Sequence, residues 1–201
     1  MALSIFWTAS PTLFTLANLD GHRARFMVAE KLAPVETRIL LSPDEAPNTL
    51  QAVNPRNIYP ILADKQLICT GSALDELINE RYPHPPLLSI LPVVRAQQRA
   101  IAAEIAHWYP LTDPTDIVSR IYELVPQGDQ AFLFSNELSI VDVAAAPFLW
   151  KHRSLIPTGR LAKYATRLFA RESFRMSLAP QTATVVTSVY RETIWTGTVA
   201  T

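Results

Sequence analysis

The chain has 201 residues, of which 49% are hydrophobic and 18% are charged, so it is long enough for one large domain or two small ones. Its 18 basic residues balance its 18 acidic residues. The absence of net positive charge argues against general nucleic-acid binding, which needs a concentrated basic surface, although it leaves room for a local basic patch. We therefore expect no direct sequence-specific contact with DNA or RNA.

The first part of the chain predicts a mixed α/β unit, because short apolar runs bounded by turn residues alternate with segments of helical repeat. In chain order we expect a strand at 12–16, a turn at 18–21, a helix at 22–32, a strand at 35–41, a helical turn at 50–53, strands at 61–64 and 66–69, and a helix ending at 81. Ser72 is the expected N-cap of the last helix, with Asp75 three residues later. The order β-α-β-α-β-β-α is that of a thioredoxin-like domain.

Three prolines follow that helix within four residues, in the run Tyr82-Pro83-His84-Pro85-Pro86. Proline fixes φ, removes a backbone donor and pushes the preceding residue toward extended geometry, so the helix must stop and a stiff segment must follow. A rigid linker between two domains explains this composition. The alternative is a preformed docking ridge that presents Tyr82 and His84 to a partner, since a stiff segment loses little conformational entropy on binding.

After this segment the sequence predicts helices only. Apolar residues at helical spacing indicate helices at 93–109, 115–124, 143–150, 161–170 and 172–178. Ser139 and Asp142 form the pattern of a capping box at the start of the third of these helices.

The predicted elements divide the chain into four parts. They are a thioredoxin-like domain at 1–83, a proline-rich linker or docking segment at 84–91, an all-helical domain at 92–179, and a Thr-rich tail at 180–201. We assign no secondary structure to the tail.

The sequence argues against export, a membrane anchor and metal chemistry. The single cysteine, Cys69, excludes an internal disulfide and a Cys-based metal cluster, and the four histidines are scattered without other ligands at metal-binding spacing. The first residues lack a basic segment followed by a long apolar stretch, and charges or prolines interrupt every apolar run before it could span a bilayer. We therefore expect a cytoplasmic protein without a bound metal.

An α/β unit followed by an all-helical unit resembles the glutathione transferase fold. Tyr59-Pro60 stands where that family has a cis-proline before a strand, and Ser139 and Asp142 stand where it has the capping box of its core helix. The resemblance implies an α+β fold in which a thioredoxin-like N-terminal domain precedes an all-helical C-terminal domain.

Within that superfamily the chain is most similar to the stringent starvation protein A branch. The matching segments are 21–25, 29–31, 54–55, 59–60, 79–87, 92–95, 107–109, 142, 146–150 and 167–174. The most specific of them is the Pro-His-Pro-Pro-Leu run at 83–87. The resemblance implies a transcription regulator of the stress response that binds RNA polymerase holoenzyme (core and sigma factor), and a dimer with a two-fold axis.

The residues at the expected glutathione site argue against catalysis. A transferase stabilises the glutathione thiolate with a hydroxyl or thiol, but the corresponding position here is Asn18. In place of the Glu/Gln-Ser pair that anchors the γ-glutamyl end, the chain has Thr70-Gly71 or Gly71-Ser72, without a carboxylate. We call Asn18, Tyr59, Pro60, Thr70, Gly71 and Ser72 the vestigial glutathione site, and expect no cofactor.

Three hypotheses remain. The first is a non-catalytic adaptor that binds RNA polymerase through residues 82–86 and alters promoter use, acting as a homodimer. The second is a glutathione transferase-type enzyme with an atypical glutathione site. The third is a partner subunit that forms a heterodimer with a paralogue before it contacts polymerase.

Overall fold

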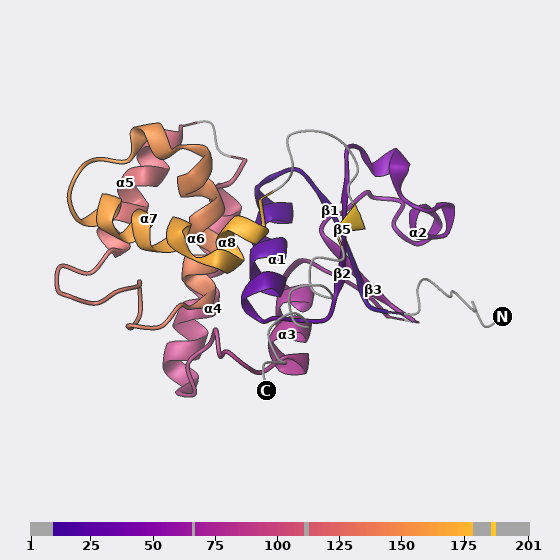
Figure 1. The fold of residues 1–201 in the computed structure, drawn as a ribbon, viewed down its shortest axis with the longest axis horizontal. Helices are drawn as coiled ribbons and strands as arrows, with labels where there is room; N and C mark the ends of the chain where they lie inside the picture. Colours follow the sequence, from indigo (N-terminus) through magenta and orange to yellow (C-terminus); the bar gives the residue numbers. More distant parts are fainter. Residues whose placement is uncertain (1–9, 66, 111–112, 179–185, 188–201) are drawn as a thin grey trace, which may run out of the picture. The chain divides into compact units, whose positions relative to one another are not determined.

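A computed structural model describes residues 10–65, 67–110, 113–178 and 186–187 (Figure 1). The chain forms two compact units, one from Met1–Tyr82 with Met176–Thr201 and the other from Pro83–Arg175. Among the described helices, none is long and apolar enough to cross a bilayer.

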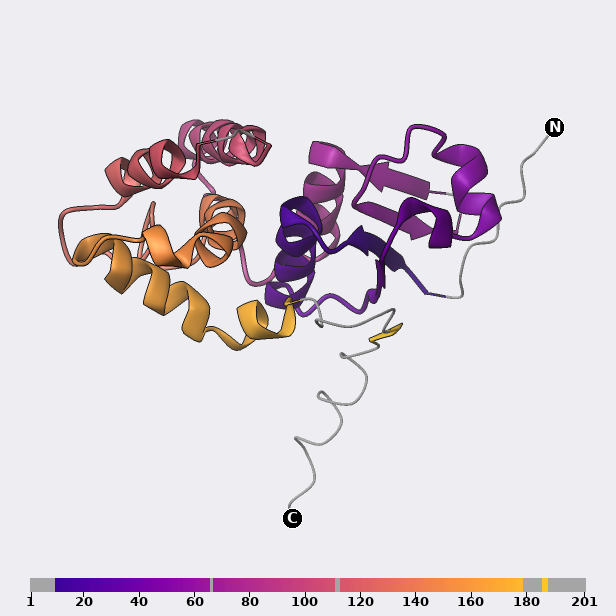
Figure 2. The ribbon, with the colours of Figure 1, turned by 90° about the horizontal axis from the view of Figure 1, so that it is seen from above.

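The first unit contains a mixed sheet with helices on both of its faces. Its strands are β1 (Thr12–Leu16), β2 (Glu36–Leu40), β3 (Ile61–Asp64), β4 (Leu67–Thr70) and β5 (Val186–Thr187), in the spatial order β4-β3-β1-β2-β5. The β1–β2 pair is parallel and the other pairs are antiparallel. Helices α1 (Leu19–Glu30) and α3 (Gly71–Arg81) lie on one face, and α2 (Asn48–Val53), preceded by the 3₁₀ turn η1 (Pro43–Glu45), lies on the other (Figures 1 and 2).

Strand β1 has apolar side chains on both sides, so helices can pack against both faces of the sheet. Successive side chains of a strand point to opposite faces, so Leu13 and Phe14 enter different layers, and both are buried. Phe14 packs with Leu50 of α2 and with Tyr59 and Ile61 in one hydrophobic cluster. The predicted order β-α-β-α-β-β-α is confirmed, and β5 adds a strand at the β2 edge that the sequence did not predict.

The prediction of a free turn at 18–21 was wrong, because these residues already belong to the start of α1. The Asn18 Oδ1 accepts a hydrogen bond from the Gly21 amide at 2.8 Å, which makes Asn18 the N-cap. A Cβ atom on Gly21 would lie 2.1 Å from the carbonyl oxygen of Leu16. Only glycine therefore permits the helix to begin this close to the end of β1.

The prediction of Ser72 as an N-cap was also wrong. Helix α3 begins at Gly71, and Thr70 occupies the cap position without a side-chain hydrogen bond. Gly71 has a φ of +58°, which lets the chain turn directly from β4 into the helix. Asp75 therefore plays no part in a capping box, and its carboxylate pairs with Arg23 instead.

The second unit is all-helical, as predicted. It contains α4 (Pro92–Trp108), α5 (Pro114–Leu124), α6 (Ile140–Lys151), the 3₁₀ turn η2 (Arg153–Leu155) and α7 (Arg160–Ala170), with α8 (Glu172–Met176) at its end. Helix α6 is apolar all round and almost wholly buried, and it packs against α4 and α7.

The predicted capping box at the start of α6 is confirmed, and its carboxylate is the centre of a larger buried network. Asp142 is 0% exposed and accepts four hydrogen bonds, from the Ser139 amide and hydroxyl, the Leu133 amide and the Tyr164 hydroxyl, at 2.6 to 3.0 Å. Burial raises the pKa of the Asp142 carboxyl, and these donors offset part of that rise. The network joins α6 to α7 and to the chain that precedes α6.

A second buried polar network holds the chain that follows α8 against α1. Arg25 donates from Nε to the Ser177 carbonyl at 2.8 Å and from Nη1 to the Thr15 hydroxyl at 3.0 Å. The His22 Nε2 lies 2.9 Å from the Ser177 hydroxyl. Burial, followed by the neighbouring Arg25 charge, lowers the pKa of His22 to about 3, so the imidazole is neutral in the folded chain.

The predicted tail at 180–201 falls mostly outside the described residues. Within it, Val186–Thr187 form β5, which pairs with Thr37 and Arg38 of β2.

We predict that Asp142→Ala destabilises the protein by about 3–5 kcal/mol, because several buried donors lose their common acceptor. Urea unfolding of the variant and the parent protein measures this difference. Asp116→Ala is the matched control, since Asp116 forms a half-exposed ion pair with Arg120 and we expect little change. Equal effects of the two substitutions would show that the Asp142 network does not hold the helical unit together.

We also predict that His22 makes the protein less stable as the pH falls. The unfolded imidazole binds a proton near pH 6.5 and the folded one only at about pH 3, so stability is fully present above 6.5 and declines from 6.5 toward 3. Between pH 6.5 and 4.5, His22→Gln should lose about 2 kcal/mol less free energy of unfolding than the parent protein. Urea unfolding at the two pH values measures this, and identical losses would contradict the prediction.

Candidate functional site

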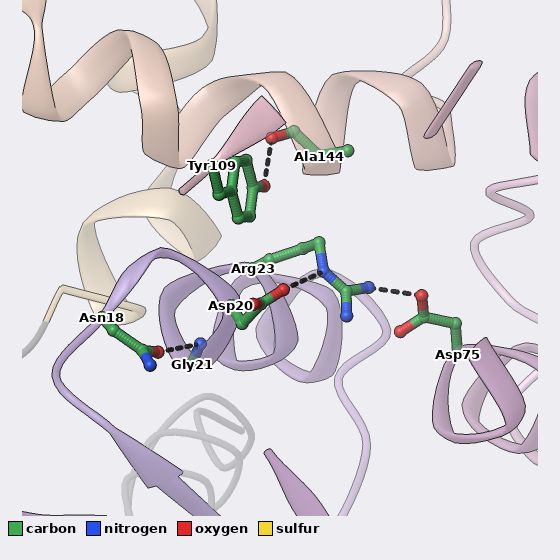
Figure 3. A network of polar contacts seen from close by, with 7 residues as sticks. All are labelled: Asn18, Asp20, Gly21, Arg23, Asp75, Tyr109 and Ala144. Carbon is green, nitrogen blue, oxygen red and sulfur yellow. Dashed lines mark hydrogen bonds and ion pairs between the residues drawn. The ribbon is translucent and has the colours of Figure 1, made fainter. Parts of the chain in front are cut away.

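The start of α1 carries Asn18, the residue at the nucleophile position of the vestigial glutathione site. Its side-chain oxygen is already engaged as the acceptor for the Gly21 amide (Figure 3). An amide in this role supplies neither a thiolate nor an ionisable hydroxyl. Asn18 therefore acts as a helix cap.

One turn further along α1, a guanidinium and two carboxylates form an ion-pair cluster that the sequence reasoning missed. Arg23 pairs through Nη1 with Asp75 of α3, and its Nε lies 3.7 Å from Asp20 (Figure 3). The Arg23 and Asp75 side chains are 8% and 14% exposed, so the pair lies in a largely dry place. Burial raises the pKa of Asp75, and the guanidinium offsets part of that rise.

The ion pair with Arg23 gives Asp75 a structural role. Its Oδ2 is committed to Arg23, and the pair ties α1 to α3 across the face of the sheet. The sequence offers one local signal for Asp75, its spacing of three residues from Ser72, and that spacing predicts a capping box. The partner of Asp75 lies 52 residues away in the sequence, and no local pattern could have indicated it.

Tyr59 and Pro60 lie where the chain enters β3. The peptide bond between them is cis, as predicted. Asn54 stabilises the loop before β3, because its Oδ1 accepts a hydrogen bond from the Ile58 amide at 3.0 Å. Tyr59 is 9% exposed and burial raises its pKa, so its hydroxyl stays protonated and faces the protein. These features give the pair a role in packing.

The third part of the vestigial site is the junction of β4 and α3. Thr70 is half-buried at the end of β4, while Gly71 and Ser72 are exposed in the first turn of α3. The first turn of the helix contains no acidic residue. A glutathione ammonium group would therefore find no carboxylate at this junction.

Two other side chains, Cys69 and Tyr109, carry groups that could take part in a reaction. Cys69 is half-buried, and burial raises the pKa of its thiol, which disfavours the nucleophilic thiolate. In the helical unit, Tyr109 donates its hydroxyl to the carbonyl of Ala144 on α6 (Figure 3). Among the described residues, no three His, Cys, Asp or Glu side chains come together to hold a metal ion.

The proline-rich segment is the most exposed of the predicted sites. Pro83, His84, Pro85 and Pro86 are all exposed, and the His84–Pro85 peptide bond is cis. Tyr82 is half-buried, with the Arg81 guanidinium 5.8 Å from the centre of its ring.

The segment is anchored on both sides. Before it, Arg81 forms an ion pair with Asp64 of β3. After it, Leu87 is 2% exposed, and its carbonyl accepts a hydrogen bond from the Ile140 amide at 2.8 Å. Four exposed residues thus follow an anchor in the first unit and precede an anchor in the second.

Solved structures with the same fold are glutathione transferases. A Tau class transferase from mango (Mangifera indica) is 18% identical, with a TM-score of 0.70 over 87% of this chain and 94% of that one. An Omega 3C transferase from Trametes versicolor is 17% identical, with a TM-score of 0.71 over 88% of this chain and 92% of that one. The predicted fold, a thioredoxin-like domain followed by a helical domain, is confirmed.

Curated proteins with a similar sequence are stringent starvation protein A homologs. The one from Pasteurella multocida is 31% identical over 190 residues, covering 83% of this chain and 89% of its own. The one from Haemophilus influenzae is 32% identical over 197 residues, with the same coverage. No protein-family model matches the chain. At this identity over nearly the whole of both sequences, the chain belongs to the stringent starvation protein A family.

Proposed function

We propose that the protein is a non-catalytic transcription regulator that binds RNA polymerase holoenzyme and alters promoter use under stress. The proposed contact is the docking ridge, residues 82–86. The observation that carries the proposal is the exposure of four consecutive residues, Pro83 to Pro86, between two anchored ends. The chain belongs to the stringent starvation protein A family, and the resemblance to that family implies an association with RNA polymerase. Family membership therefore supports polymerase as the partner.

The chemistry of the ridge suits a protein partner. Three pyrrolidine rings offer rigid apolar surface, and the His84 imidazole offers a donor and an acceptor in the same stretch. The proline rings restrict the backbone of this segment, so it has less conformational entropy to lose when it binds. Protein interfaces concentrate their binding energy in a few rigid anchors of this kind.

The state of the vestigial glutathione site supports a non-catalytic role. Asn18 is consumed as a helix cap, and the β4–α3 junction has no acidic residue in its first turn. Asp75, the nearest carboxylate along α3, is paired with Arg23. None of these groups is a hydroxyl or thiol of the kind that stabilises a glutathione thiolate in a transferase.

The proposed assembly is a dimer in the cytoplasm, either of two copies or with a paralogue. Solved relatives in fold are transferases, and a two-fold axis is the commonest symmetry of soluble oligomers. Light scattering on the purified chain, alone and with the paralogue, distinguishes the two assemblies.

We predict that the double variant His84→Ala, Pro85→Ala binds RNA polymerase at least about ten-fold more weakly, because it removes the imidazole and one rigid ring of the ridge. Co-purification of the tagged chain with polymerase holoenzyme, followed by titration, measures this loss. The matched control is His107→Ala, Pro110→Ala, which changes the same two residue types at exposed positions outside the ridge. Binding that is unchanged in the ridge variant, or equally weakened in the control, would refute the docking proposal.

The second candidate is a glutathione transferase-type enzyme, and the observation that favours it is the cis Tyr59–Pro60 bond in a transferase fold. One of the solved structures similar to this chain, a transferase homolog, carries bound glutathione. The two candidates differ in whether the chain holds the tripeptide.

We predict that the protein is not retained on immobilised glutathione and does not turn over an electrophilic aromatic substrate. The physical reason is the missing thiolate donor and carboxylate anchor. An authentic transferase is the positive control for both assays. Specific elution by free glutathione together with turnover would establish the enzyme and set aside the non-catalytic proposal.

A further inference from the structure

The helical unit contains a hollow of about 220 Å³ that neither the family resemblance nor the proposed polymerase contact uses. Residues 125–131, which follow α5, form one wall, and one side of α7 with Gly159 forms the other. Figure 1 shows α5 and α7 in this unit. The hollow lies entirely within the unit from Pro83–Arg175.

The wall formed by α7 is strongly cationic. Arg160, Lys163 and Arg167 all line the hollow, and their spacing of three and four residues places them on one side of the helix. Asp129 is the acidic residue that lines it. Across the described residues, none of the three cations forms an ion pair with a carboxylate. The hollow therefore carries an excess of two positive charges.

Two of these cations are held in place before any ligand arrives. Arg160 donates from Nη2 to the Tyr122 carbonyl at 3.1 Å, and its guanidinium lies 4.0 Å from the centre of the Tyr122 ring. Arg167 donates from Nη1 to the carbonyls of Gln130 and Ala131 at 3.4 and 3.2 Å. Fixed guanidinium groups lose little side-chain entropy when they bind an anion.

Hydrogen-bonding capacity is left over on this wall. Gly159 caps α7 without a side chain, so the first-turn amides receive no side-chain acceptor, and the helix dipole adds positive potential there. Lys163 is exposed and its ammonium is available.

The opposite wall is also fixed. The Leu133 amide donates to the buried Asp142 carboxylate at 3.0 Å, and the Ala131 amide donates to Asn136 Oδ1 at 2.9 Å. Together with the Arg167 bonds to the carbonyls of Gln130 and Ala131, these bonds fix the end of this wall. Both walls therefore have fixed points before a ligand binds.

We propose that this hollow binds a small phosphate-bearing anion, of the size of inorganic pyrophosphate or a small phosphomonoester. An anion of two or more charges balances the cationic excess, and guanidinium forks match the geometry of phosphate oxygens. Sites for drug-sized ligands occupy about 300–1,000 Å³, so a smaller hollow favours a small ligand over a whole dinucleotide. The site is independent of polymerase binding.

Isothermal titration of the full chain with inorganic pyrophosphate, at low ionic strength, tests the proposal. We expect saturable one-to-one binding. Lys163→Ala should weaken it about ten-fold, because the variant removes one charge-assisted contact. The Lys163 ammonium forms no hydrogen bond or ion pair with the described residues, so the melting temperature of the Lys163→Ala variant should equal that of the parent protein. Arg167→Gln is a second variant, expected to weaken binding as well.

The matched control is Lys151→Ala, at an exposed lysine outside the hollow. It should bind pyrophosphate as the parent protein does. Absence of saturable binding, or an equal loss in Lys151→Ala and Lys163→Ala, would overturn the site. So would Lys163-dependent binding of a single-stranded oligonucleotide in the absence of pyrophosphate binding, because the surface would then be a nucleic-acid contact.

Discussion

The close approach of α1 to the end of β1 is the constraint on which the first unit depends. Gly21 has no room for a side chain beside the Leu16 carbonyl, and Asn18 caps the helix at that point. This fixed starting point sets the direction in which each later side chain of α1 points. One turn later the helix directs Arg23 to Asp75, and the neighbouring side chains of His22 and Arg25 contact Ser177.

The same constraint explains why a transferase fold can persist without a transferase site. The polar side chains near the old site have structural partners: the Asn18 side-chain oxygen accepts from the Gly21 amide, and the Asp75 carboxylate pairs with the Arg23 guanidinium. A buried ion pair contributes little net stability over an apolar pair, but removal of one member leaves an unpaired charge in a dry place. Substitution of either Arg23 or Asp75 alone is therefore destabilising, which disfavours changes that would rebuild a glutathione site around them.

The two surfaces proposed for function have a common physical basis. Both the docking ridge at 82–86 and the cationic hollow beside α7 consist of exposed polar or rigid groups held by buried anchors. Leu87 bonds to the Ile140 amide at the start of α6, and Asp142, two residues later, bonds to the Leu133 amide, two residues beyond the wall of the hollow. The capping region of α6 therefore anchors one end of the docking ridge and also fixes the chain next to the hollow.

By itself, the sequence determined the order of the strands and helices, the capping box at Ser139 and Asp142, the cis bond before Pro60 and the exposed character of the proline run. Each of these follows from residues a few positions apart, where periodicity, capping and proline geometry act. Only the tertiary structure decided that Asn18 is a cap and not part of a turn, that Asp75 pairs with Arg23, and that Arg167 of α7 bonds to loop carbonyls 36 and 37 residues earlier in the chain. These depend on which side chains meet after folding, because charge pairing and cavity shape are properties of residues distant in sequence.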